Sequence, residues 1–244
     1  MISIIVALYN EETRFPVLYP ILEGFLEALG EPWELVLVDD GSNDRTREII
    51  RGWAEKDGRI RVVSLARNLG QGAAVKAGML LSRGDIVLYT DADMAIPLRW
   101  FTELIGRVRS GSDLAIASRW MPGAVIKVPQ PALRRNLGKL YYWLAHRLVF
   151  DGIYDTNCGL KVYRGDAARL IFGFVRSWRW TFNIEHLWVA HRLGYSIAEV
   201  PIEWSHERLS KVHVFRDCLF TLWELTALKL RQMMGGYPVI VSKH

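Results

Sequence analysis

The chain has little cysteine and lacks long uninterrupted apolar stretches. Only Cys158 and Cys218 occur among 244 residues, so a paired-cysteine zinc ribbon is excluded and a disulfide framework is not expected. The longest stretch without Lys, Arg, Asp or Glu is 232–242, whereas a membrane-spanning helix needs about 18–20 apolar residues. The apolar run 2–8 ends in Asn-Glu-Glu, which indicates a buried strand and not a signal peptide. We therefore expect a cytosolic globular protein that folds without disulfides or metal.

Acidic residues are also missing from one long segment. Residues 114–150 contain no Asp or Glu but six basic residues, and the net charge of the whole chain is +5. A local basic patch indicates an anionic partner such as a phosphate, a nucleotide, a lipid headgroup or nucleic acid; the alternative is a solvated basic face. The six residues are Arg119, Lys127, Arg134, Arg135, Lys139 and Arg147.

Short apolar runs alternate with helical patterns over the first 120 residues. Strands are predicted at 2–8, 33–38, 60–65, 85–89 and 114–117, with helices between them. This order predicts an α/β domain with a mainly parallel sheet. Beyond residue 118 we expect a proline-rich loop at 120–131, helices at 132–150, 182–192 and 212–234, and strands at 160–163 and 196–204.

Polar side chains follow each of the five predicted strands. The carboxyl ends of parallel strands share one edge of a sheet, and open α/β sheets bind ligands at that edge. Each cluster alone is as consistent with an ordinary loop, but five in register predict a single site. In chain order the clusters are Tyr9-Asn10-Glu11-Glu12, residues 39–44 (DDGSND), Arg67-Asn68, Thr90-Asp91-Ala92-Asp93 and Ser118-Arg119.

The pair Asp91 and Asp93 is the most specific part of this predicted site. Two carboxylates beside an apolar strand are costly unless something neutralises them. A hard divalent cation bound through oxygens does so, and it can also hold a diphosphate. The alternative is a pair that caps the helix after Pro97. Asp40 is predicted to accept hydrogen bonds from a base or ribose, or only to form a turn, and Tyr9 to stack on a base.

At these residues the chain resembles the inverting family-two glycosyltransferases of the GT-A fold. The matching motifs are ALYNEE, LVDDGSNDRT, NLGQGAAVKAG, YTDAD and ASR, all within residues 1–120. Further on, DTNCGLK, WTFNIE, EVPIEW and the Ser-Lys pair at 210–211 look like the branch of the dolichyl-phosphate β-glucosyltransferases, to which dolichol-phosphate mannose synthases are related. The resemblance implies a catalytic domain at 1–211, divided into a nucleotide-sugar half (1–118) and an acceptor half (119–211), and a C-terminal amphipathic helix with a tail at 212–244.

The resemblance also implies a role for individual residues. Arg119, with Arg134 or Arg135, would meet an acceptor phosphate, and Lys211 would close over the donor. Asp91 and Asp93 would serve the metal, Mg²⁺ or Mn²⁺, and the diphosphate. Ala7 stands where the family usually has proline, and its contact would be largely through the backbone. The nucleotide sugar, UDP-glucose or GDP-mannose, would be bordered by Ala7, Tyr9, Glu11, Asp40, Asn68, Gly72, Asp91, Ala92, Asp93 and Lys211.

The implied reaction is a single displacement at the anomeric carbon with inversion, assisted by Asp91, Asp93 and Arg119. A polyprenyl (dolichyl) phosphate acceptor is largely ionised at neutral pH, since its second pKa is about 6, and it needs cations to position it. A sugar hydroxyl, on a lipid-linked or soluble glycan, would instead need a carboxylate base. Glu185 and Asp155 are the candidates for that base, or else they are structural hydrogen-bonding partners.

The helices predicted at 132–150 and after residue 212 carry apolar stripes edged by cations and aromatic residues. This pattern is typical of helices that lie in a lipid headgroup layer, and the alternative is tertiary packing. We expect a peripheral enzyme on the cytoplasmic face of a membrane, with or without a separate anchoring subunit. A nucleic-acid-binding module would explain the basic segment but not the strand-end aspartates. A nicotinamide dehydrogenase would need its glycine fingerprint after the first strand.

Overall fold

The computed structural model describes residues 1–128, 152–205 and 214–237, together with residues 138, 143, 147 and 149. For 214–222 only the backbone is described. The predicted helix at 132–150 lies mostly outside these residues. So do three predicted site residues, Arg134, Arg135 and Lys211.

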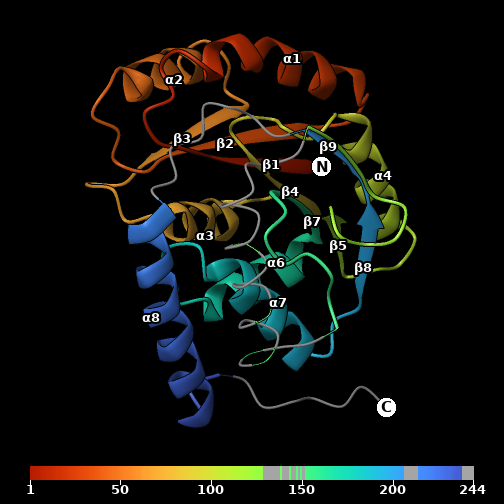
Figure 1. Ribbon diagram of the computed structural model, residues 1–244. Helices are drawn as coiled ribbons and strands as arrows, with labels where there is room; N and C mark the ends of the chain where they lie inside the picture. Colours follow the sequence, from red (N-terminus) through yellow and green to blue (C-terminus); the bar gives the residue numbers. More distant parts are fainter. Residues whose placement is uncertain are drawn as a thin grey trace.

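The described chain is built on a seven-stranded sheet of order β3-β2-β1-β4-β7-β5-β8 (Figure 1). Neighbouring strands are parallel, except that β7 runs antiparallel to both β4 and β5. The predicted α/β fold with a mainly parallel sheet is therefore confirmed, and the first five strands lie within two residues of their predicted bounds. The strands are β1 (Ile2–Leu8), β2 (Trp33–Asp39), β3 (Ile60–Ser64), β4 (Ile86–Asp91), β5 (Leu114–Ser118), β7 (Leu160–Arg164) and β8 (Ile197–Pro201).

Helices cover both faces of this sheet (Figure 1). Successive side chains of a strand point to opposite faces, and in β1 Ile4 and Val6 join one apolar cluster while Ile5 joins the other. Burial on both faces explains why the strands read as continuous apolar runs. On one face lie α1 (Phe15–Ala28), α2 (Thr46–Ala54) and α4 (Arg99–Arg109). On the other lie α3 (Gln71–Leu81), α6 (Gly165–Phe174), α7 (Phe182–Arg192) and α8 (Val214–Met233).

The second half of the chain departs from the predictions in three places. The segment 120–131, expected as a loop, contains β6 (Val125–Val128), which pairs in parallel with β9 (Glu203–Ser205) in a small second sheet. The strand expected at 196–204 is divided into β8 and β9. Helix α6 was not predicted. All four residues of β6 are exposed, so it has no alternating burial that a sequence pattern would reveal, and its strand character depends on a distant partner.

Helix α8 packs its inner face on the domain through Leu225 and Leu228, which are fully buried. Its bounds lie within two residues of the helix predicted at 212–234. Of the helices in the described part of the chain, none has the length and apolar character needed to cross a bilayer.

Candidate active site

The carboxyl ends of β1, β2 and β4 meet at one edge of the sheet. Leu8 lies opposite Asp39, and Ala7 lies opposite Asp91. Because β7 is antiparallel, its first residue, Leu160, lies opposite Thr90 of β4, so the segment 155–159 also reaches this edge. The structure thus brings together the strand ends that the sequence predicted. It adds the segment 155–159, whose Asp155 the sequence named as a candidate base without assigning it to this edge.

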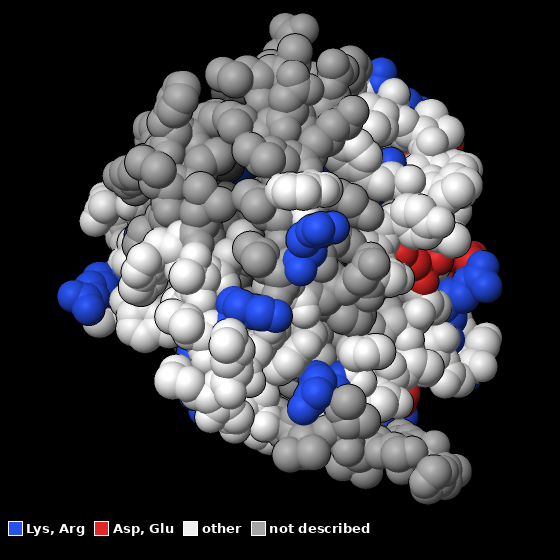
Figure 2. All heavy atoms as spheres, turned by 60° about the horizontal axis from the view of Figure 1, so that its bottom comes forward, with Lys and Arg blue, Asp and Glu red and all other residues white. Residues whose placement is uncertain are grey.

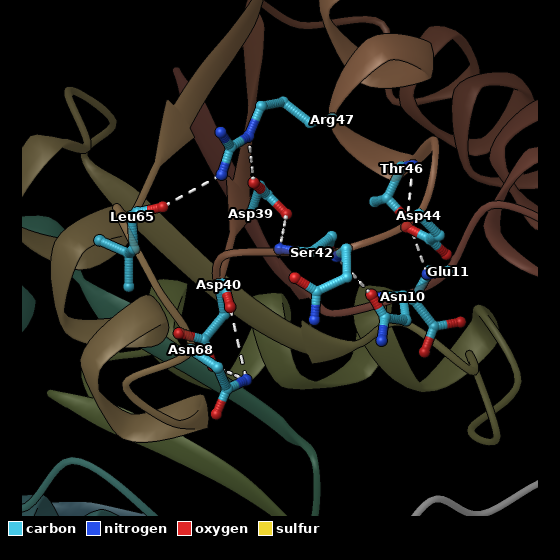
Figure 3. A network of polar contacts seen from close by, with 11 residues as sticks. Asn10, Glu11, Asp39, Asp40, Ser42, Asp44, Thr46, Arg47, Leu65 and Asn68 are labelled. Carbon is cyan, nitrogen blue, oxygen red and sulfur yellow. Dashed lines mark hydrogen bonds and ion pairs between the residues drawn. The ribbon is translucent and has the colours of Figure 1, made fainter.

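Asp40 fixes the loop that precedes α3. Its carboxylate is almost fully buried. One oxygen accepts a hydrogen bond from the backbone N–H of Leu69 at 2.8 Å. The other accepts hydrogen bonds from the Gly70 N–H and from the Asn68 side-chain amide, each at 2.9 Å. Figure 3 shows the bond between Asp40 and Asn68. Burial raises the pKa of Asp40. The described contacts of Asp40 and Asn68, both predicted to border the nucleotide, therefore hold two loops of the site together.

A second network joins the end of β1 to the start of α2 (Figure 3). Asn10 has φ 55°, a left-handed conformation that asparagine adopts more readily than most residues other than glycine. Its N–H donates to Ser42 Oγ at 3.0 Å, and the Glu11 N–H donates to Thr46 Oγ1 at 2.7 Å. The Glu11 carboxylate accepts hydrogen bonds from Nε and Nη2 of Arg14, at 2.8 and 2.6 Å. The side chains after β1 are thus held by the chain around them.

Asp91 is held on two sides. Its Oδ1 accepts Gln71 Nε2 at 2.6 Å and the Tyr89 hydroxyl at 2.7 Å. On the other side lies Gly159, where a Cβ atom would stand 1.9 Å from Asp91 Oδ2. The backbone N–H of Asp91 also donates to the Gly159 carbonyl at 3.2 Å. The carboxylate is therefore clamped between α3, its own strand and the segment before β7.

Asp93 lies just past the end of β4, with a residue of positive φ, Met94 (46°), beside it. Asp93 Oδ1 accepts the N–H of Ala95 at 3.2 Å. Oxygen ligands of this kind fit Mg²⁺ or Mn²⁺, and Mg²⁺ sites often combine one or two carboxylates with substrate phosphates. The pair fits a cation that a bound diphosphate helps to hold. Within the described residues, no group of three or more His, Cys, Asp or Glu is arranged for a metal.

Arg119, which is partly buried, and Asp155, which is buried, form an ion pair at the same edge. Nε and Nη2 of Arg119 donate to the two carboxylate oxygens of Asp155 at 2.7 and 3.0 Å, and the Asp155 side chain is 2% exposed. Burial opposes the charge of Arg119, but Asp155 outweighs burial and keeps the pKa of Arg119 above its ordinary value. One edge of the guanidinium predicted to meet the acceptor is thus bound to a carboxylate of the chain.

Lys161, which was not among the predicted site residues, is fully buried beside this ion pair. Its Nζ donates to the Cys158 carbonyl at 2.6 Å and to Asn183 Oδ1 at 2.9 Å, and it lies 5.7 Å from the centre of the Tyr89 ring. Burial lowers the pKa of Lys161 to about 8. A single lysine between apolar neighbours in a predicted strand is the sequence signal that would have identified it.

Glu185, a predicted catalytic residue, is fully buried in α7. Its two oxygens accept the backbone N–H groups of Arg176 at 3.0 Å and Ser177 at 2.7 Å, and Tyr237 donates its hydroxyl to the same carboxylate. These bonds match the structural alternative stated for Glu185. They attach the turn after α6 to α7.

The glycines at the start of α3 allow close approach to a neighbouring segment. Gly70 has φ 107°, and a Cβ there would lie 2.7 Å from the Trp178 carbonyl oxygen. At Gly72 a Cβ would lie 2.8 Å from the Ser177 carbonyl oxygen. Of the remaining predicted residues, Ala92 is buried at the end of β4, and Ala7 and Tyr9 are partly buried at the end of β1.

Comparisons with known proteins agree with this fold. The model of the family "Glycosyl transferase family 2" matches residues 3–172. A dolichyl-phosphate beta-glucosyltransferase of Trichomonas vaginalis is 35% identical over 87% of this chain, which spans 66% of that relative. The dolichyl-phosphate beta-glucosyltransferase of Dictyostelium discoideum is 30% identical over 98% of this chain and 76% of its own.

Among solved structures, glucosyl-3-phosphoglycerate synthase of Mycobacterium tuberculosis, crystallised with Mn²⁺, UDP-glucose and phosphoglyceric acid, has the same fold. Its TM-score is 0.64 at 19% identity, and the similarity covers 94% of this chain and 79% of the synthase. The extent of the family match and the identity to the two relatives lead to one conclusion. The chain belongs to glycosyl transferase family 2 and is a glycosyltransferase similar to the dolichyl-phosphate β-glucosyltransferases.

Proposed function

We propose that this enzyme transfers a hexose, glucose or mannose, from a nucleotide sugar to a polyprenyl (dolichyl) phosphate with inversion at the anomeric carbon. The observation that carries the proposal is the similarity, over nearly the whole chain, to proteins named for the glucose reaction on dolichyl phosphate. In this proposal residues 1–118 hold the donor and 119–211 hold the acceptor. The reaction takes place at the cytoplasmic surface of a membrane, where the phosphate of a lipid-linked acceptor lies.

On the donor side, the chain orders the loops that surround the nucleotide sugar. Asp40 holds 68–70 in place, and Tyr9 stacks on the base. Asp91 and Asp93 would hold a divalent cation, Mg²⁺ or Mn²⁺, and such a cation stabilises the charge of a departing nucleoside diphosphate. Asp91 is suited to this role because Gln71 and Tyr89 fix its carboxylate before any ligand arrives. Such preorganisation avoids reorganisation during the reaction.

On the acceptor side, the phosphate is itself the nucleophile and needs orientation more than a base. Arg119 supplies a guanidinium at the edge of the sheet, and Arg134 or Arg135 supplies a second. The contacts of the two candidate bases support this phosphate acceptor over a sugar hydroxyl. Asp155 is ion-paired with Arg119, and the bonds of Glu185 go to the turn after α6 and to Tyr237. A general base must reach the proton that it removes.

The first test is a transfer assay in which UDP-glucose and GDP-mannose are each offered with a polyprenyl phosphate, in Mg²⁺, in Mn²⁺ and in EDTA. We expect one donor to be used, and activity to depend on the cation. Asp93→Ala should abolish transfer while its thermal melting stays close to that of the wild type, because Asp93 lies outside the core. Full activity in EDTA, or an active Asp93→Ala enzyme, would contradict the metal role.

A second test separates acceptor binding from donor binding. The double variant Arg134→Ala/Arg135→Ala should raise the acceptor KM or lower kcat and leave donor affinity, measured by calorimetry, nearly unchanged. Charge-assisted hydrogen bonds from guanidinium to phosphate are the physical reason. Lys127→Ala is the control, because Lys127 belongs to the same basic segment but pairs with Glu203. An equal loss of donor affinity in the double variant would contradict the assignment.

A further inference from the structure

In the side-chain amide of Gln71, the first residue of α3, the nitrogen makes hydrogen bonds and the oxygen makes none among the described residues. Its Nε2 donates to Asp91 Oδ1 at 2.6 Å and to the Tyr89 hydroxyl at 2.7 Å. A carboxylate oxygen only accepts hydrogen bonds. The amide must therefore present its nitrogen to Asp91, and its oxygen must point elsewhere.

That oxygen, Gln71 Oε1, is buried and has no hydrogen-bond partner among the described residues. Buried amide oxygens are nearly always paired, and an exception calls for an explanation such as a ligand that supplies the missing donor. Gln71 as a whole is only partly buried. Its amide nitrogen contacts Asp91, so the buried oxygen lies beside the carboxyl edge of the sheet, where ligands bind in open α/β sheets.

The amide has little freedom to find a donor within the protein. Helix α3 lies very close to the sheet, since a Cβ at Gly78 would stand 2.3 Å from Ile5 Cγ2. Its first turn is held by the backbone bond from Ala73 N–H to the Trp178 carbonyl at 3.0 Å. Because both ends of the helix are fixed, the amide remains directed by Asp91 and Tyr89.

We propose that Gln71 Oε1 accepts a hydrogen bond from a hydroxyl group of the bound nucleotide sugar. Gln71 then recognises the nucleotide sugar through its side-chain oxygen and orients Asp91 through its side-chain nitrogen. The inference rests on the proposed function as far as the donor is concerned and is independent of the acceptor. Phosphate oxygens are excluded as the partner, because they carry no proton to donate at neutral pH. Both the ribose and the hexose carry hydroxyl groups that can donate a hydrogen bond.

The test measures the affinity of donors that each lack one hydroxyl, by calorimetry in Mn²⁺. The probes are the nucleotide sugar that the wild type transfers, its nucleoside diphosphate, and forms of each without a single hexose or ribose hydroxyl. For the wild type we expect one of the deoxy forms to bind roughly tenfold more weakly, as for one neutral hydrogen bond. If the critical hydroxyl is on the ribose, its removal should weaken binding of the nucleoside diphosphate as well as of the nucleotide sugar. If it is on the hexose, only the nucleotide sugar should be affected.

Two variants distinguish recognition of the nucleotide sugar by Gln71 from positioning of Asp91 by Gln71. Gln71→Met is close in size and has no amide, so it should bind the parent donor at least as weakly as the wild type binds the critical deoxy form, with no further loss for that form. Tyr89→Phe is the matched control. It removes a hydrogen bond to Asp91, but Tyr89 is almost fully buried, so it should retain the tenfold discrimination.

If Gln71→Met weakens every donor by the same factor, Gln71 only positions Asp91 and the inference is wrong. Should Gln71→Met fail to fold, Gln71→Asn replaces it; its shorter amide should also lose the discrimination, and retained discrimination would contradict the inference. A wild type that binds nucleotide sugars but transfers to no polyprenyl phosphate would overturn the proposed acceptor and leave this inference standing. A wild type that binds none would overturn both.

Discussion

Gly159 is the residue on which the position of Asp91 depends most directly. A Cβ at this position would overlap Asp91 Oδ2 at 1.9 Å. Since Gly159 also accepts the Asp91 N–H, neither group can move without displacing the other. We expect Gly159→Ala to lower transfer activity by roughly 100-fold, which is the order of loss for a displacement of about 1 Å in an active site. Steady-state kinetics at saturating metal would measure this.

Gly106→Ala is the matched control for that substitution. Gly106 lies in α4, and a Cβ there would meet nothing within 4 Å. Replacing a helical glycine by alanine in open space should leave activity unchanged and raise the free energy of unfolding by up to about 1 kcal/mol. If Gly159→Ala were as active as Gly106→Ala, the close contact with Asp91 would not matter for catalysis.

The burial of Lys161 leads to a prediction about how the free energy of unfolding depends on pH. Burial lowers its pKa from 10.5 to about 8. Between these values the unfolded chain binds a proton that the folded protein does not, so the contribution of Lys161 to the free energy of unfolding rises with pH. The slope is at most about 1.4 kcal/mol per pH unit. Below pH 8 both states bind the proton, and the contribution is constant.

Urea unfolding of the wild type and of Lys161→Met between pH 7 and pH 9.5 measures this contribution as a difference. We expect the wild type to gain stability relative to the variant as the pH rises above 8. Lys127→Met provides the comparison with an exposed lysine, since Lys127 is 58% exposed. A difference between the wild type and Lys161→Met that stays constant with pH would show that Lys161 titrates at its ordinary pKa.

At the scale of elements, α7 holds the turn after α6 through one carboxylate. Glu185→Gln would place an amide N–H₂ against the N–H of Arg176 or Ser177, which leaves buried donors without acceptors. The free energy of unfolding should fall by about 1–3 kcal/mol. Transfer activity measured well below the melting temperature should persist at more than a tenth of the wild-type rate. If stability stayed unchanged while kcat fell by several orders of magnitude, Glu185 would be the general base and the acceptor would be a hydroxyl.

The segment between α6 and α7 also connects α8 with the start of α3. Glu224 of α8 accepts the N–H groups of Arg179 and Thr181, each at 3.4 Å. The segment between α6 and α7 in turn packs against Gly70 and Gly72 at the start of α3. A continuous series of contacts therefore runs from α8 to the loop that Asp40 holds.

At the scale of the whole molecule, we propose that the outer surface at the C-terminal end of α8 contacts a lipid surface. Its C-terminal end exposes Leu230, Met233 and Met234, and Lys229 and Arg231 lie among them. The face seen from below carries basic side chains across its middle, whereas the acidic side chains in view gather at one side (Figure 2). Apolar residues combined with cations are typical of proteins that bind anionic membranes at the surface.

We expect the protein to sediment with anionic liposomes more than with neutral ones, and less at high salt because salt screens the charges. Met233→Ser/Met234→Ser should weaken the binding. Val17→Ser should not, since Val17 is an exposed apolar residue of α1, on the opposite face of the sheet. If the protein stays in the supernatant with both lipids at low salt, a soluble acceptor or a separate anchoring subunit becomes the better explanation.

The sequence by itself determined the alternation of strands and helices over the first half and the chemistry at the strand ends. A strand buried on both faces needs a continuous apolar run, and the runs at 4–8 and 35–38 therefore stand out locally. Parallel order then places Asp40, Asp91 and Asp93 at one edge. These features depend on residues a few positions apart, which a periodic pattern records.

Only the tertiary structure decided how distant segments meet. It inserts antiparallel β7 between β4 and β5 and thereby brings Gly159 to Asp91 and Lys161 to a position opposite Tyr89. It also pairs exposed β6 with β9 and gives Glu185 its partners at Arg176, Ser177 and Tyr237. A residue's own sequence neighbours do not encode these contacts, because they depend on which strands become adjacent and on how closely α3 and α7 pack on the sheet. For the same reason, the unpaired oxygen of Gln71 becomes visible only once Asp91 and Tyr89 are placed beside it.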